Sequence, residues 1–481
     1  MGWRLEHTYA DLPQLFSSPA APTPVREPRL VVLNRPLATA LGLEPDTLAR
    51  PGAAAIFAGN ALPDGARPIA QAYAGHQFGH FTVLGDGRAI LLGEQITPCG
   101  SRVDIQLKGP GKTRFSRRGD GRAALGPMLR EYIISEAMRA LGIPTTRSLA
   151  VATTGEPVYR EGRLDGAVLT RVAASHIRVG TMQWAAANED VDATRALADY
   201  TRARHYPELA ESAEPHLGLL DAIVARQAAL IARWQLVGFI HGVMNTDNMA
   251  LSGETIDYGP CAFMDAYDPA TVFSSIDEGG RYAYGNQPPI AQWNLARLAE
   301  AMLPLFDPVV ERAVERATEV LNRFPDLFKQ HWLDGVRAKL GLFTPEDDDQ
   351  ALADDLLAWM QRRSADFTNT FRSLSSGRPA ESSPGADPEF DSWHGRWAAR
   401  RGRQSQTPAE SDTLMRQHNP AFIPRNHNVE AALEAATTSH DLSVMERLLE
   451  VLATPYDHDR NLPMFSAPGP GERRYVTYCG T

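Results

Sequence analysis

The 481-residue chain is poor in cysteine and contains no long hydrophobic run. Three cysteines, Cys99, Cys261 and Cys479, are too few for a disulfide framework, and no two of them have zinc-finger spacing. No apolar stretch approaches the ~20 residues that a membrane-spanning helix needs. The charged residues that follow Met1 interrupt the apolar stretch of a signal peptide. We therefore expect a cytoplasmic protein that is not secreted and does not contact a membrane.

Basic residues are outnumbered by acidic ones, and lysine is especially scarce. The 48 Lys and Arg against 58 Asp and Glu give a net charge of −10, which argues against a nucleic-acid partner. Only Lys108, Lys112, Lys329 and Lys339 are lysines. A compact ammonium suits a phosphate in a tight site better than a planar guanidinium does. A biased genomic base composition that leaves a few lysines by chance explains their scarcity equally well.

What the chain does contain is the composition of an ordinary globular protein, with 43% hydrophobic and 22% charged residues. Its length allows two or three packed units. Residues 1–70 are rich in Pro and Ala and predict an N-terminal extension. Residues 71–175 predict strands with one helix, and residues 176–372 predict mostly helices. Residues 373–481 begin with a loop rich in Ser, Pro and Gly, and a helical pair at about 428–453 precedes the tail.

The strand-rich part combines a glycine turn, a lysine and a glutamate. The apolar runs 80–84 and 89–94 flank Gly85-Asp86-Gly87 and predict a hairpin. Residues 103–108 alternate apolar and polar side chains and predict a strand that ends at Lys108. Pro127 and Gly142 bracket a predicted helix that carries Glu131 and Glu136. These two glutamates are roughly 140° apart around the helix, so only one can face Lys108, and the residues alone do not decide which.

Residues 241–259 are the most informative stretch. Protein kinases carry H-R-D-x-x-x-x-N followed by D-F-G, which supply a base and two metal ligands. Here Asn248 and the Asp257 of Asp-Tyr-Gly occupy the metal positions, Val243 stands where the base should be, and a carboxylate recurs at Asp247. Asn and Asp are also common in solvated turns, and Asp247 could act as a base or only orient its neighbour. Residues 249–256 predict a small hairpin after a long amphipathic helix at 220–234.

Other phosphate-binding patterns are weaker. Gly109-Pro-Gly-Lys112-Thr113 is not a P-loop, because Gln106 stands where that motif requires a glycine. The cationic, Gly-containing loop 114–122 could hold a phosphate or lie in solvent. Arg171 and Arg178 flank a strand-to-helix transition and could donate to phosphate oxygens, although surface exposure is the commoner outcome for arginine.

Several long strings in fixed order resemble the selenoprotein O family, pseudokinases that act as protein adenylyltransferases. The strings cover nearly the whole chain and are Gln71–His80, Leu84–Arg88, Gln106–Arg117, Gly119–Arg122, Leu129–Tyr132, His241–Asn248 and Asp257–Pro260. The resemblance implies an α+β, two-lobed, kinase-like fold. It also implies that ATP binds end-for-end relative to a kinase, so that a Ser, Thr or Tyr hydroxyl of a substrate protein displaces pyrophosphate and acquires AMP.

The resemblance also assigns roles to residues. Asp247 matches the proton acceptor, Asn248 and Asp257 match the ligands of Mg²⁺ or Mn²⁺, and the Lys108 partner falls at Glu131. The matching nucleotide contacts are Gly85, Gly87, Arg88, Lys108, Asp120, Gly121, Arg171, Arg178 and Asp257.

Cys479 occupies the family's selenocysteine position, and Cys261 follows Asp257-Tyr-Gly-Pro. A reversible Cys261–Cys479 disulfide is therefore a hypothesis of redox control, against the alternative of two unrelated cysteines. Two other functions remain open: a kinase with Asp247 as a relocated base, and an inactive pseudokinase that only binds nucleotide.

Overall fold

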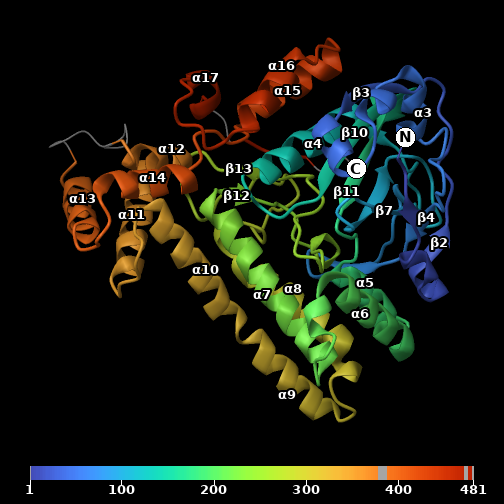
Figure 1. The fold of residues 1–481 in the computed structure, drawn as a ribbon, viewed down its shortest axis with the longest axis horizontal. Helices are drawn as coiled ribbons and strands as arrows, with labels where there is room; N and C mark the ends of the chain where they lie inside the picture. The colour runs from blue at the N-terminus through green and yellow to red at the C-terminus, as the bar shows by residue number, and fades with distance from the viewer. Residues whose placement is uncertain (1, 377–386, 471–474, 479–481) are drawn as a thin grey trace.

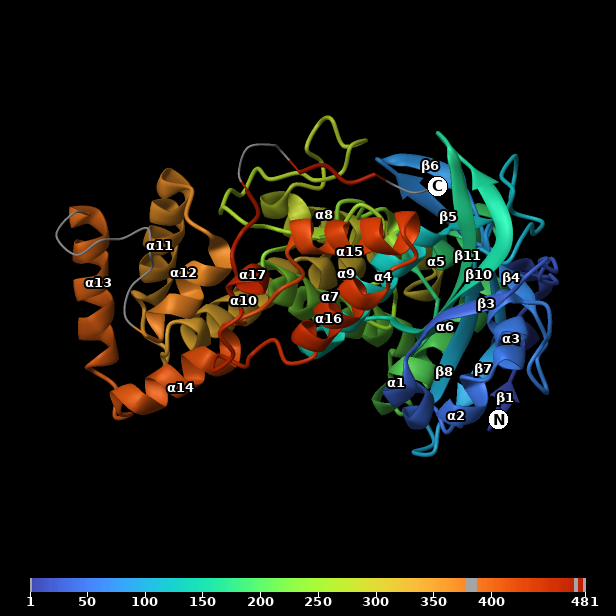
Figure 2. The same ribbon diagram turned by 90° about the horizontal axis from the view of Figure 1, so that it is seen from above.

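The computed structural model describes residues 2–376, 387–470 and 475–478. It combines a large sheet with a set of helices, as the α+β prediction requires. The sheet lies at one end of the elongated molecule and most helices at the other (Figures 1 and 2). In the described part of the chain, no helix is long and apolar enough to cross a membrane.

The main sheet has nine strands in the described residues, in the order β2-β4-β7-β8-β11-β10-β3, with β1 paired to β7 and β9 to β11. The strands of the protein are β1 Leu5–Glu6, β2 Ser17–Pro19, β3 Arg29–Leu33, β4 Ile69–Gln71, β5 Ala74–Gln77, β6 His80–Val83, β7 Ala89–Ile96, β8 Arg102–Lys108, β9 Ala123–Ala124, β10 Arg147–Tyr159, β11 Arg163–Ala173, β12 Phe239–Ile240 and β13 Ala262–Phe263. Residues 1–70, expected as an extension, thus contribute β1, β2, β3 and the start of β4 to the main sheet.

The helices cover the sheet and form the second part of the molecule. They are α1 Arg35–Ala40, α2 Pro45–Leu48, α3 Ala54–Ala58, α4 Leu125–Ala140, α5 Val179–Ala187, α6 Val191–His205, α7 Pro215–Leu236, α8 Gln287–Met302, α9 Val310–Leu321, α10 Phe324–Lys339, α11 Asp349–Arg363, α12 Phe367–Leu374, α13 Pro388–Arg401, α14 Pro408–His418, α15 Asn426–Thr438, α16 Ser443–Leu452 and α17 Pro463–Ser466. The predicted helices at 127–142, 220–234 and 428–453 are confirmed, whereas α13 and α14 were not predicted.

Both faces of the sheet are buried, and successive residues of a strand serve different cores. Leu91 and Leu169 pack in the core that contains α4, while their neighbours Ile90 and Val168 pack against α1–α3. This is the alternation expected of a strand with a period of two. The sheet therefore holds β8 and β11 rigidly between two apolar layers, and these strands carry Lys108 and Arg171.

The predicted hairpin across Gly85-Asp-Gly is wrong. β6 pairs with β5, and β7 pairs with β1, β4 and β8. The chain instead turns at Phe78-Gly79, where both residues have positive φ, 50° and 87°. Such a two-residue turn favours Asn-Gly or Asp-Gly, so a phenylalanine in it concealed the hairpin from the sequence pattern. The strand pairing leaves Gly85-Asp-Gly as a connection between two sheets.

The predicted hairpin at 249–256 is also wrong, because its two arms pair with other segments. Leu251 donates to the Ile177 carbonyl at 2.9 Å, and Thr146 donates to the Thr255 carbonyl at 3.0 Å. Gln227, the polar interruption in the apolar stripe of α7, donates to the Ala250 carbonyl at 2.8 Å and is buried. These bonds fix the loop that leads from Asn248 to Asp257.

Candidate active site

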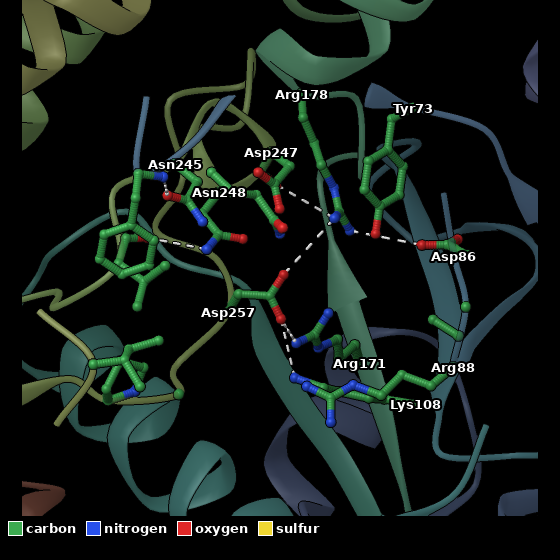
Figure 3. Close-up of a pocket in the computed structure, with 18 residues that line it drawn as sticks. Tyr73, Asp86, Arg88, Lys108, Arg171, Arg178, Asn245, Asp247, Asn248 and Asp257 are labelled. Carbon is green, nitrogen blue, oxygen red and sulfur yellow. Dashed lines mark hydrogen bonds and ion pairs between the residues drawn. The ribbon is translucent and has the colours of Figure 1, made fainter. Parts of the chain in front are cut away.

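A cavity of about 340 Å³ lies between the main sheet and the loop 241–260 (Figure 3). Its lining brings together predicted site residues from segments that lie far apart in the chain. They are Gly87, Arg88, Lys108, Arg171, Arg178, Asp247, Asn248 and Asp257.

A network of charges forms the floor of the cavity. Lys108 Nζ lies 2.7 Å from Glu131 Oε2 and 3.0 Å from Asp257 Oδ1, and Arg171 donates to the same two carboxylates. Burial raises the pKa of both carboxyl groups, but Arg171 and Lys108 outweigh it and hold each pKa below its usual value. Glu136 instead pairs with Arg147 at 2.6 Å. The geometry therefore joins Lys108 to Glu131.

Arg178 is fully buried but less closely paired than Arg171. Its guanidinium lies 3.9 Å from Asp86 and 3.8 Å from Asp257. The Tyr73 ring holds it from one side, with 4.4 Å between the guanidinium carbon and the ring centroid. A buried cation with only long contacts to carboxylates retains capacity to bind an anion in the cavity. Tyr73 lies within the string 71–80, and the sequence pattern indicated no role for it.

Asp247 lies in a short 3-10 helix, Thr246–Asn248, pressed against two glycines. A Cβ at Gly75 would lie 2.6 Å from Asp247 Oδ1, and one at Gly180 would lie 3.4 Å from the Asp247 Cα. Only backbone without a side chain fits there. Burial raises the pKa of Asp247 to about 6, against the opposing effect of Arg178. Its buried Oδ1 has no hydrogen-bond partner among the described residues, so this oxygen can accept a proton.

Asn248 and Asp257 present oxygens to the same space. Asn248 Nδ2 donates to the Val243 carbonyl at 3.0 Å, which turns Oδ1 toward the cavity (Figure 3). Asp257 has a φ of 62°, a backbone conformation that costs energy and recurs at functional sites. Among the described residues, no three His, Cys, Asp or Glu side chains gather to hold a metal. Mg²⁺ commonly needs only one or two protein carboxylates when phosphates and water complete its shell, so this oxygen pair fits it.

A second cavity of about 620 Å³ adjoins the first and shares Tyr73, Gln77, Gly87, Arg88 and Asp247 with it. Its lining adds further residues of the predicted nucleotide set, namely Gly85, Asp120 and Gly121.

The glycines of the second cavity lie where the chain leaves no room for a side chain. A Cβ at Gly85 would lie 2.5 Å from the Phe115 ring, and one at Gly121 would lie 2.1 Å from the Gly111 carbonyl oxygen. Asp120 pairs with Arg160 at 2.9 Å. The two cavities thus share part of their lining, and basic side chains line both of them.

Of the two cysteines in the redox hypothesis, one lies within the described residues and the other does not. Cys261 is buried beside the site, and burial raises the pKa of its thiol to about 12. Cys479 lies outside the described residues, so the proposed pairing stays a prediction.

Comparison with known proteins identifies the family. A sequence model described as "Protein adenylyltransferase SelO" matches residues 3–453. The chain belongs to the SelO family. SelO proteins are protein adenylyltransferases by this description, so the chain is an enzyme of nucleotidyl transfer, with ATP as substrate.

Curated relatives of this SelO chain are similar over their full length. "Protein nucleotidyltransferase YdiU" of Halalkalibacterium halodurans is 60% identical over 483 residues, covering 100% of this chain and 98% of the relative. The proteins of the same name from Bacillus cytotoxicus and Brevibacillus brevis are 58% and 60% identical, again over 100% of this chain and 98% of each relative. The resemblance inferred from the sequence is thus confirmed for the SelO family.

Proposed function

We propose that ATP spans both cavities with its terminal phosphates innermost and its adenosine in the second cavity. Lys108, Arg171 and Arg178 supply three cations at the inner end of the first cavity. The observation that carries this proposal is the position of Asp247, which borders both cavities. A nucleotide bound in this direction has its α-phosphate at the junction, beside the carboxylate, and its γ-phosphate buried among cations.

The chemistry follows from that orientation. A hydroxyl oxygen of the protein substrate forms a bond to the α-phosphorus, and the bond from that phosphorus to the oxygen bridging to the β-phosphorus breaks. The hydroxyl proton passes to Asp247, while Lys108 and Arg171 receive the charge that accumulates on the pyrophosphate. Arg178, held between Tyr73 and the carboxylates, contacts the phosphates near the point of attack.

Asn248 and Asp257 would hold Mg²⁺ or Mn²⁺, which supplies charge neutralisation to the phosphates when bound. Lys108 and Arg171 already engage Asp257 Oδ1, whereas the ion pair that the described residues form with Oδ2 is the longer contact of 3.8 Å to Arg178. The second oxygen therefore fits the role of ligand.

We further propose that the chain divides into two kinase-like lobes. We also propose that the protein is cytoplasmic. Residues 71–175 would form the N-terminal lobe and residues 176–372 the C-terminal lobe, between the extension 1–70 and the segment 373–481. The order of the lysine strand β8, the glutamate helix α4, and the loop with Asn248 and Asp257 supports this division. A Cys261–Cys479 disulfide would add redox control, and recovery of both thiols free after mild oxidation and peptide mapping would contradict it.

Labelled ATP tests the reaction. Incubation of the full chain with protein substrates should leave label on protein from [α-³²P]ATP and none from [γ-³²P]ATP. Label from the γ position would instead indicate a kinase with Asp247 as a relocated base. ATP binding without label of either kind would indicate an inactive nucleotide-binding pseudokinase.

A further inference from the structure

The hairpin of β5 and β6 covers the proposed catalytic residue and has one strand unpaired at its outer side. On the inner side, His76 N–H donates to Thr246 Oγ1 at 2.7 Å, so β5 is held to the turn that carries Asp247. On the outer side, no strand in the described part of the chain pairs with β6. The hairpin therefore connects an open sheet edge to the site.

The backbone of β6 points its free groups outward. Leu84 N–H donates to the Tyr73 carbonyl at 3.0 Å, which marks these two residues as a hydrogen-bonded pair. Hydrogen-bonded and non-bonded pairs alternate along an antiparallel ladder, so the N–H and C=O groups of Phe81 and Val83 face away from β5. Both side chains are exposed, at 46% and 52%. Exposed edge strands with apolar side chains are templates for an added strand.

The edge leads toward the site of reaction. β6 continues directly into Leu84 and Gly85, which line the second cavity together with Asp247. In-line displacement requires the attacking oxygen and the leaving pyrophosphate on opposite sides of the phosphorus. With pyrophosphate in the first cavity, the acceptor hydroxyl must arrive from the side of the second cavity.

The other end of the hairpin is cationic. The guanidinium of Arg281 lies 3.9 Å from the position of a Cβ on Gly79, and 4.9 Å from the Trp293 ring centroid. No carboxylate of the described residues forms an ion pair with Arg281, and its buried Nε lacks a hydrogen-bond partner there. A cation left without a carboxylate at the hairpin tip complements an acidic side chain on a partner.

We propose that the outer edge of β6 binds an extended segment of the protein substrate as an additional strand, with an acidic side chain beside Arg281 and the acceptor hydroxyl at the second cavity. The proposal rests on the orientation of ATP proposed above. At about 3.4 Å per residue, the length of β6 places the acidic residue about four residues from the acceptor.

Synthetic 12-residue peptides with one serine test the proposal, with glutamate four residues before or after it. AMP incorporation from [α-³²P]ATP is measured with the full chain. Val83→Pro removes an outward N–H while leaving the bonds to β5, and we expect it to lower kcat/KM for the peptide by about tenfold or more. The matched variant Val83→Thr keeps the N–H and should stay within about twofold of the parent. Arg281→Gln should abolish the preference for the glutamate peptide over its glutamine counterpart.

A second measurement avoids any dependence on a variant that folds poorly. Peptides N-methylated at alternate residues lose hydrogen bonding along one edge only, so one of the two methylated series should lose labelling and the other should retain it. The proposal would be overturned if both series were labelled equally, if Val83→Pro were as active as the parent, or if Val83→Pro lost its affinity for ATP. A parent dimer that Val83→Pro dissociates would also overturn it, because a second copy would then occupy the edge. If the parent instead binds ATP but transfers no AMP to any protein, the proposed function itself fails.

Discussion

Asp247 is a carboxylate displaced along the chain from the position of the base in the kinase motif. Its carboxylate borders two cavities, and its Oδ1, which has no hydrogen-bond partner among the described residues, lies against the backbone of Gly75. The position where a kinase base would stand carries Val243, which lines the first cavity without any group that can accept a proton. Under the proposed mechanism, proton transfer therefore depends on one side chain.

The substitution Asp247→Asn keeps the shape of that side chain and removes its proton acceptor. We expect AMP transfer to fall by about 10²–10⁴-fold, the usual contribution of a positioned base. ATP affinity should change by less than about twofold, because Lys108, Arg171 and Arg178 remain. Steady-state labelling and calorimetric titration with ATP measure the two effects separately. Transfer within about tenfold of the parent would show that another group takes the proton.

At the scale of elements, local patterns were predictable and pairings were not. The strand that ends at Lys108 and the helix of Glu131 follow from periodicities of two and 3.6 residues, which depend on neighbours in sequence. The choice of Glu131 over Glu136 depends on how α4 sits on the sheet, which the residues alone left undecided. The turn at Phe78-Gly79 departs from the usual residue preference, and tertiary contacts hold it: Phe78 N–H donates to Asn245 Oδ1 at 3.1 Å.

The role of Tyr73 was equally beyond the sequence. Its ring stacks on Arg178, which is 105 positions away in the chain. The only signal was its place in the string 71–80, which carried the family resemblance and lay in a region expected to form strands, but which indicated no role for Tyr73. Gly75 belongs to the same category, since only the packed structure shows that a side chain there would collide with Asp247.

Helix α10 ends at Lys339, a buried lysine whose burial opposes folding. Its ammonium lies 4.3 Å from the Phe371 ring centroid and pairs with no carboxylate among the described residues. Burial lowers the pKa of Lys339 from 10.5 to about 7. The folded state thus binds fewer protons than the unfolded state, so the free energy of unfolding rises as pH increases from about 7 to 10.5.

We expect Lys339→Met to stabilise the protein at neutral pH. The burial cost of the ammonium is of the order of 4 kcal/mol, and its attraction to the aromatic rings returns about 2, which leaves a net gain of about 2 kcal/mol. The variant should also lose the rise of stability above pH 7. Urea unfolding at pH 6, 8 and 10 measures both effects. Lys329→Met, at an exposed position on the same helix, is the matched control, and an equal response of the two variants would contradict the interpretation.

At the scale of the whole molecule, the last described residues return to the site. Tyr475 Oη lies 2.5 Å from Arg130 of α4 and from Glu430 of α15. Thr477 exchanges backbone hydrogen bonds with Phe273 and Ser275, and its buried hydroxyl donates to the Pro260 carbonyl at 2.7 Å. The tail thereby joins the helix that carries Glu131 to the segment that follows Asp257.

Thr477→Val tests whether this tail holds the site segment in place. Valine has nearly the shape of threonine but leaves the Pro260 carbonyl without its donor, at a cost of about 1–3 kcal/mol. Local opening should become easier by a similar amount, so the Ser275 amide, which donates to the Thr477 carbonyl at 2.9 Å, should exchange its hydrogen at least about fivefold faster. Hydrogen exchange read by mass spectrometry over residues 270–280 measures this. Tyr478→Ala changes a neighbouring side chain that is 74% exposed and should leave the exchange unaltered. Tyr478 adjoins Thr477 in the chain but is exposed. If the two variants exchanged hydrogen at equal rates, the Thr477 hydroxyl would not be what holds the segment that follows Asp257.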